Sequence, residues 1–240
     1  MARFARHSAA STELYGLNPF LILDGQHRVF GFSLAKTSLR VPVVIYNSLS
    51  PRDESRLFID INTKQRPVPN ELLLDIKKLA ESQTETEQLM SDVFDRFDHA
   101  QGSALLGQMS PHERRTKKIS RVTFNAGLKP LLGIFGNADA EEIYVALNGY
   151  LSAFISGMKK LKVADSIVKP TLFKASLLLF KEAAQRVQDR YGKDYSSEHF
   201  AEVLSPFFEN VKASVFRNPP TSLRDLQEEF SKNFKTSFTL

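Results

Sequence analysis

Residues 20–36 carry the segment FLILDGQHRVFGFSLAK, in which a short apolar run, an Asp-Gly pair and a helical pattern follow one another. The run at 20–23 has the length and flanks of a buried strand. Asp24 and Gly25 end that strand, and the helical pattern then extends over about 26–36. These residues predict a strand–turn–helix motif.

A second apolar run at residues 39–46 predicts another strand, in which Pro42 indicates a sheet edge or a strand start. Together with the first motif it forms a small β-strand–helix–β-strand unit. Periodicity, caps and punctuation predict helices from Pro51 to about 61 and then at about 71–80, 85–97, 125–135, 139–160, 170–191, 197–213 and 221–234. We therefore expect an α+β fold: a small mixed sheet within residues 1–82 and a mainly helical part over 83–240, packed together as one unit.

The composition is that of an ordinary globular chain: 240 residues, 42% hydrophobic and 25% charged. There is no Cys, which excludes disulfides, Cys-ligated metals and thiol catalysis and fits the reducing cytoplasm, where we expect the protein. Nineteen Phe and no Trp predict a core whose aromatic part is mostly phenylalanine. The formal charge of +5 permits a nucleic-acid or nucleotide partner. No apolar run approaches 18 residues, so we expect no membrane span.

The turn at residues 24–28 has the chemistry of an anion site, because a helix N-terminus presents free N–H groups and the positive end of the helix dipole. Gly25 lets a ligand approach the backbone. Arg28 can bind a phosphate through two N–H groups, and His27 adds a donor or a titratable base. The plainer alternative is that Asp24 caps the helix, Gly25 makes a turn and the two cations are solvated.

The polar stretch at residues 62–66, NTKQR, predicts a loop between a helix end and two prolines. Two cations and three amide or hydroxyl side chains could close over a phosphate or a base. The alternative is a solvated helix C-cap with Asn62 in the left-handed conformation.

Two segments resemble a known family. Residues 21–31, LILDGQHRVFG, resemble the signature of the DGQHR-domain proteins, and residues 58–68, FIDINTKQRPV, resemble that family's second motif. The family contains the DndB-type proteins of DNA phosphorothioation clusters and the DpdB-type proteins of DNA 7-deazaguanine clusters. At the first motif it is similar to the ParB and sulfiredoxin superfamily, in which an analogous turn binds nucleotide phosphate.

The resemblance implies a nucleotide-binding accessory protein of a DNA-modification system, with ATP or another nucleotide as cofactor. Phosphate chemistry in general adds Mg²⁺ to that expectation. Its partners would be DNA and other DNA-modification proteins, and the oligomeric state stays open. The resemblance leaves open whether the protein is an enzyme; if it is, it is a non-Walker ATPase acting on or with DNA. Asp24 and His27 are the catalytic candidates. The phosphate-binding candidates are Gly25, Gln26, His27 and Arg28, with Asn62, Lys64, Gln65 and Arg66 opposite them. Family members carry a longer region before the first motif, so we expect a fragment or a shortened form.

A basic cluster lies at residues 112–121, HERRTKKISR. Its cations suit contacts with a DNA phosphate backbone: Arg114, Arg115, Lys117, Lys118 and Arg121. The cluster supports an alternative function, a non-enzymatic DNA-binding regulator of a phosphorothioation-type modification operon. The plainer interpretation is a solvated basic loop. No helix-turn-helix, zinc finger or RNA-binding aromatic motif accompanies the cluster.

Other patterns carry less chemistry. No two His have helical metal-ligand spacing, and we expect no metal site; a nuclease of the ParB-like kind therefore lacks support. Asp92, Asp95 and Asp98 are expected on the solvated face of their helix. Neither a Walker-type phosphate loop nor a serine-hydrolase elbow is present.

Overall fold

A computed structural model of the chain describes residues 22–38, 40–65 and 69–234, without the side chains of residues 62–65. The chain divides into two compact units. The first comprises residues 1–69 and 76–82, and the second comprises residues 70–75 and 83–240. The helix α3 (Asn70–Leu79) contributes its first turns to the second unit and its end to the first unit.

The first unit contains two further helices, α1 (Gln26–Ser33) and α2 (Pro51–Gln65). Helices at both places were predicted, and α2 begins as expected, with the N–H of Asp53 donating to Ser50 Oγ at 3.2 Å. The two predicted strands are wrong where the structure describes them, because residues 22–24 and 40–46 are irregular. Residues 20, 21 and 39 lie outside the described part. A strand exists only through its pairing, and 40–46 has no backbone hydrogen bond to another described residue.

The polar stretch after α2 was also predicted wrongly. Residues 62–65 form the last turn of α2 and not a loop. No Gly or Pro interrupts α2 before Pro67, and a proline disfavours helical backbone chiefly at the residue that precedes it. Arg66, the last residue of the predicted loop, lies outside the described part.

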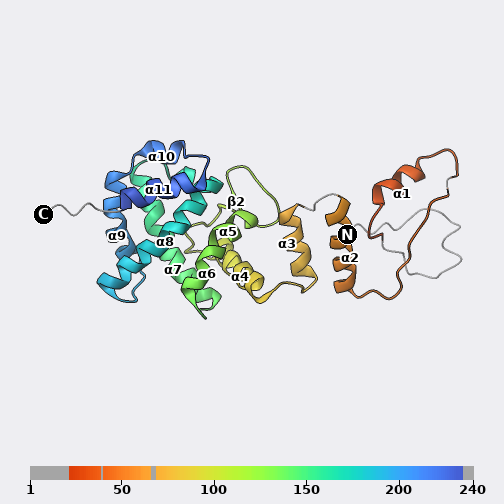
Figure 1. Cartoon of the computed structure of the whole chain (residues 1–240), viewed down its shortest axis with the longest axis horizontal. Coiled ribbons are helices and arrows are strands. Elements are labelled where there is room, and N and C mark those ends of the chain that lie inside the picture. Colours follow the sequence, from red (N-terminus) through yellow and green to blue (C-terminus); the bar gives the residue numbers. More distant parts are fainter. Residues whose placement is uncertain (1–21, 39, 66–68, 235–240) are drawn as a thin grey trace. The chain divides into compact units, whose positions relative to one another are not determined.

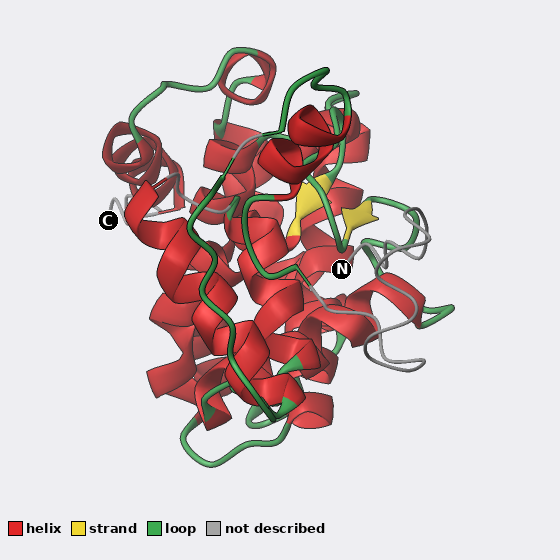
Figure 2. Cartoon of the chain, turned by 90° about the vertical axis from the view of Figure 1, so that its right-hand side faces the viewer, coloured by secondary structure: helices red, strands yellow, loops and turns green. Residues whose placement is uncertain are grey.

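The second unit is mainly helical (Figures 1 and 2). Its helices are α4 (Glu85–His99), α5 (Arg121–Leu128), α6 (Leu132–Phe135), α7 (Ala140–Lys160), α8 (Pro170–Tyr191), α9 (Ser197–Asn210), α10 (Ala213–Arg217) and α11 (Leu223–Phe234), with 3₁₀ turns at Lys129–Leu131 and Ala164–Val168. Two short strands, β1 (Met109–Ser110) and β2 (Ile119–Ser120), pair in parallel, Met109 opposite Ile119. The fold is thus mostly helical with one small sheet among the described residues. That sheet is parallel and lies between α4 and α5, whereas a mixed sheet near the N-terminus was expected.

Local sequence signals explain where the long helices begin. Thr84 accepts from the N–H of Glu87, whose carboxylate accepts from the N–H of Thr84, and Asp139 and Glu142 form the same reciprocal cap on α7. Pro170 opens α8 at the first helical position, where a missing N–H costs nothing. These caps place α4, α7 and α8 close to their predicted starts.

The aromatic part of the core of the second unit is mostly phenylalanine, as predicted. Among the Phe that the structure describes, eleven are less than 2% exposed, and all eleven lie between residues 94 and 234. Helix α7 packs chiefly against α9, and α8 packs against α5 and α11. Helices α4 and α5 meet through the edge-to-face pair Phe94–Phe124, whose ring centroids are 5.4 Å apart. This contact fixes the start of α5, and with it Arg121, against α4.

Candidate functional site

The first candidate site is the turn before α1. Gly25 is the N-cap of this helix and has φ 85°, a left-handed conformation that favours glycine. No side chain caps α1, and its first turn holds no acidic residue. The first N–H to bond back is that of Val29, which donates to Gly25 O at 2.9 Å. The N–H groups of residues 26–28 therefore stand at an uncapped helix start, as an anion site requires.

Arg28 and Asp24 form an ion pair across this turn. Arg28 Nη2 lies 3.0 Å from Asp24 Oδ2, and the side chains are 69% and 33% exposed. A Cβ placed on Gly25 would lie 3.4 Å from Arg28 Nη2, so glycine also leaves room for this pair. A phosphate that bound here would replace Asp24 as the partner of Arg28. His27, the neighbour of Arg28 in the sequence, is exposed.

The remaining described features of the first unit leave the predicted shared cleft untested. An open hollow of about 510 Å³ is lined by the end of α1 and the segment after it, including Val29, Phe32 and Val41. None of the predicted phosphate-binding residues lines this hollow. Of the second motif, Asn62, Lys64 and Gln65 are placed by their backbone only, on the last turn of α2, and Arg66 lies outside the described residues. The predicted shared cleft therefore stays a prediction.

The second candidate site is a loop of the second unit, residues 111–118, which we call the basic loop. Strands β1 and β2 join its two ends, and Ser110 Oγ donates to Glu113 O at 2.6 Å. Arg114, Arg115 and Lys117 are exposed. Arg115 Nε pairs with Glu113 Oε1 at 2.5 Å. The loop thus presents three cations to solvent from a base that is tied by hydrogen bonds.

Lys118 stands partly apart from these three cations. It is half-buried, and its Nζ donates to Gly107 O at the foot of the loop. Lys118 would have to break that bond before it could bind a phosphate.

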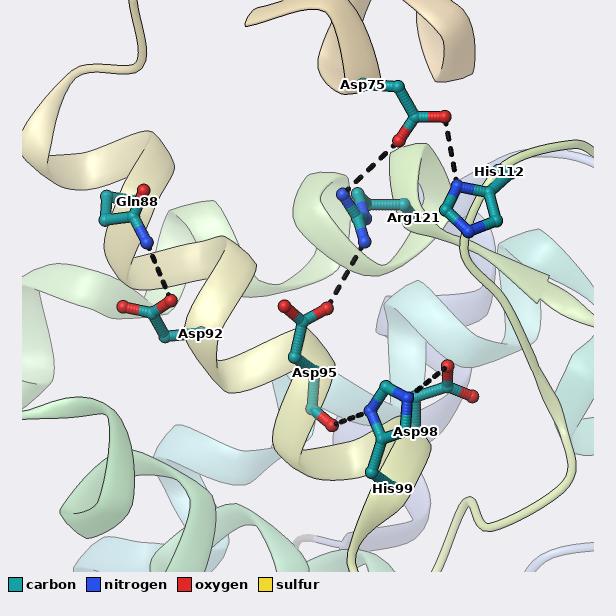
Figure 3. Close-up of polar contacts among 8 residues, drawn as sticks. All are labelled: Asp75, Gln88, Asp92, Asp95, Asp98, His99, His112 and Arg121. Atoms are coloured by element: carbon teal, nitrogen blue, oxygen red, sulfur yellow. Dashed lines mark hydrogen bonds and ion pairs between the residues drawn. The ribbon is translucent and has the colours of Figure 1, made fainter. Parts of the chain in front are cut away.

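Arg121 does not belong to this exposed set, which corrects its assignment as a DNA contact. Its side chain is only 4% exposed. It lies between two carboxylates, with Nη2 3.2 Å from Asp95 Oδ1 and Nη1 3.6 Å from Asp75 Oδ1 (Figure 3). Its guanidinium also lies over the ring of Phe94, 4.9 Å from the ring centroid. A buried cation that already has two anionic partners is not available to a phosphate.

Three residues around Arg121 were not predicted as site residues. Asp75 comes from α3, Asp95 from α4 and His112 from the basic loop (Figure 3). Asp95 was expected on a solvated face, but it pairs with Arg121. One sequence signal existed: Arg121, Phe124 and Leu128 recur at helical spacing and are all buried, so Arg121 lies on the inner face of α5.

No metal centre accompanies either site within the described ranges: nowhere there do three His, Asp or Glu side chains gather as a set of ligands. None of the described helices is both long enough and apolar enough to cross a bilayer. Protein-family models, curated proteins and solved structures were compared with the chain, and none of them matches it significantly.

Proposed function

We propose that the chain is a nucleotide-binding accessory protein of a DNA-modification system, of the DGQHR type that its two motifs resemble. The observation that carries the proposal is the start of α1. It is uncapped, it follows a left-handed Gly25, and it has Arg28 within reach of the turn. ATP is the nucleotide to test first. Mg²⁺ would arrive on its phosphates, because Mg²⁺ bound with nucleotides keeps few protein ligands.

The roles of the residues follow from this arrangement. The N–H groups of residues 26–28 and the guanidinium of Arg28 would bind phosphate oxygens, and Asp24 would be displaced from Arg28. Asp24 and His27 stand beside the bound phosphate, so they remain the candidates for catalysis if the nucleotide is hydrolysed. Asn62, Lys64, Gln65 and Arg66 remain the candidates for the opposite wall.

Equilibrium dialysis with radiolabelled ATP and Mg²⁺ tests this function. Arg28→Ala should abolish binding. It should cost the fold little, because an exposed ion pair contributes about 0.5 kcal/mol. Gly25→Ala should also weaken binding, since alanine disfavours the backbone at φ 85°. Arg40→Ala, which removes another exposed cation of the same unit, is the matched control. Unchanged ATP binding by Arg28→Ala would refute the site.

A second candidate function rests on a separate observation, the exposure of the basic loop. We propose that Arg114, Arg115 and Lys117 contact the phosphate backbone of duplex DNA, as a DNA-binding regulator of a modification operon would require. Each neutralised phosphate steepens the salt dependence of log K by about 0.9. Three contacts therefore predict a contribution to the slope of roughly −2.7.

Fluorescence anisotropy with labelled duplex DNA over a salt series measures this slope. Replacing the three cations by Ala should weaken binding equally for unrelated DNA sequences and flatten the slope by about 2–3. The control replaces Lys159, Lys160 and Lys162 by Ala, an equal loss of charge from exposed positions at the end of α7. If both triple variants weaken binding alike, the loop has no special role.

A further inference from the structure

Arg121 connects the start of α5 to two other helices. It is the first residue of α5, directly after the N-cap Ser120, and its side chain turns inward onto Phe94 of α4. Both of its carboxylate partners come from other helices, Asp75 from α3 and Asp95 from α4. A guanidinium presents five N–H groups in a fixed plane, so it can hold two carboxylates at once.

The basic loop is attached to this arginine through a single histidine. His112 Nδ1 lies 3.1 Å from Asp75 Oδ2, while the other oxygen of Asp75 faces Arg121 (Figure 3). Because a carboxylate can only accept, Nδ1 carries the hydrogen in this bond. The contacts form one chain, from the loop through His112 and Asp75 to the buried Arg121 and on to Asp95.

The conformation of the loop requires such an attachment. Lys117 has φ 60°, a left-handed conformation that is strained for a residue with a side chain. Its neighbours Arg114, Arg115 and Lys118 carry like charge, which favours an extended, solvated chain. A strained turn among like charges persists only where several other contacts hold it in place. The bonds of His112, Ser110 and Lys118 supply those surroundings.

We infer that Asp75 and Arg121 are positioning residues, which hold the basic loop through His112 in one fixed presentation of its cations to DNA. The inference rests on the proposed DNA-binding function of that loop. It predicts that Asp75 raises the affinity for DNA, although the negative charge of Asp75 alone would lower that affinity. A carboxylate close to a phosphate-binding surface lowers DNA affinity by repulsion, whereas a carboxylate that pre-orders the loop raises affinity by reducing the entropy lost on binding.

A pair of charge-matched variants separates the two effects. Asp75→Asn and Asp92→Asn each remove one negative charge, but Asp92 accepts a hydrogen bond from Gln88 on its own helix, whereas Asp75 contacts His112 of the loop (Figure 3). Simple electrostatics predicts that both variants bind DNA slightly more tightly. The positioning role predicts that Asp75→Asn binds roughly fivefold more weakly at constant salt, while Asp92→Asn does not. His112→Ala should reproduce the loss without touching the buried pairs of Arg121.

Limited trypsin digestion reports on the loop without DNA. Cleavage after Arg114, Arg115 and Lys117, followed by mass spectrometry, should be several-fold faster in Asp75→Asn and His112→Ala than in the parent and in Asp92→Asn. Circular dichroism melts should show all four proteins folded at the digestion temperature. If Asp75→Asn unfolds, His112→Ala decides, because His112 is exposed and leaves the core intact.

Each combination of results has a definite meaning. Equal cleavage and equal DNA affinity for His112→Ala, Asp75→Asn and Asp92→Asn would overturn the positioning role. If the parent protein shows no affinity for DNA, the proposed DNA function fails, and the cleavage rates alone decide whether Asp75 and Arg121 order the loop. Faster cleavage together with weaker DNA binding in both loop-anchor variants supports the inference.

Discussion

Gly149→Ala is the sharpest test of the second unit, because α7 and α9 depend on a close approach at this glycine. A Cβ on Gly149 would lie 2.4 Å from the carbonyl oxygen of Tyr195, about 1 Å inside an ordinary contact. The obstacle is backbone just before α9, which cannot turn away as a side chain can. Overpacking of this kind costs about 1–3 kcal/mol, and the better helix propensity of alanine returns up to about 1 kcal/mol. We expect a net loss of about 1–2 kcal/mol.

Two further glycines calibrate this value. At Gly133, in α6, an added Cβ would have nothing within 4 Å, so Gly133→Ala should stabilise the protein by about 0.4–1 kcal/mol through the unfolded state. At Gly157 the three atoms nearest to the Cβ all belong to the ring of Phe208, a half-buried side chain and not backbone, so the loss should be smaller than at Gly149. Urea unfolding followed by circular dichroism gives all three values. A Gly149→Ala variant as stable as the parent, beside a stabilised Gly133→Ala, would refute the close packing of α7 against Tyr195.

Two other predictions concern the core and its boundary. Burial, and secondarily the charge of Glu182, raises the pKa of Tyr150 well above its ordinary value, and its hydroxyl donates to Ser176 O at 2.6 Å. Above about pH 10 the unfolded state therefore loses this proton and the folded state keeps it, so the free energy of unfolding should fall as pH rises. Tyr150→Phe should reduce that fall in alkaline urea titrations; an unchanged slope would place the alkaline sensitivity elsewhere. Residues 69–240 alone should melt within a few degrees of the full chain, because, among the described residues, almost all buried apolar side chains lie between Met90 and Phe234; loss of the cooperative transition would contradict this.

Most helices of the second unit were predictable because their signals are local, but α5 begins at Arg121, four residues before its predicted start, and the predicted helix at 197–213 is divided into α9 and α10. Caps such as Thr84 and Asp139, the proline at 170 and the glycine at 192 act within one turn of the residue that they punctuate. The end of α2 was missed because a run of polar residues was taken for a loop, although nothing in residues 62–65 breaks a helix. Polarity alone predicts a solvated face and does not end a helix.

Strands and the Arg121 contacts depend instead on partners far away in the chain. Residues 40–46 are apolar and β-branched, yet Val43 and Val44 are more than 70% exposed, and no other described segment pairs with them. The local sequence pattern indicates a tendency to form a strand, but it does not show which segment would pair with that strand. In the same way, a cation in a basic run looked like part of a DNA surface. Its partners Asp75 and Asp95, 46 and 26 positions earlier in the numbering, are visible only in the folded chain.

The two candidate sites differ in how many buried contacts surround them, and this difference decides which assay can detect a ligand at each site. Within residues 22–65 the only side chain that the structure shows as buried is that of Ser55. Few buried apolar contacts mean a low free energy of local opening, so melting of the whole chain reports mainly on the second unit. ATP bound at α1 would therefore be missed by a thermal shift but detected by dialysis. The basic loop is different, because it is tied to buried Arg121, and changes at Arg121 itself also reach the cooperative core through Phe94. If a ligand raises the melting temperature, its binding site is thus better placed in the second unit than at the turn before α1.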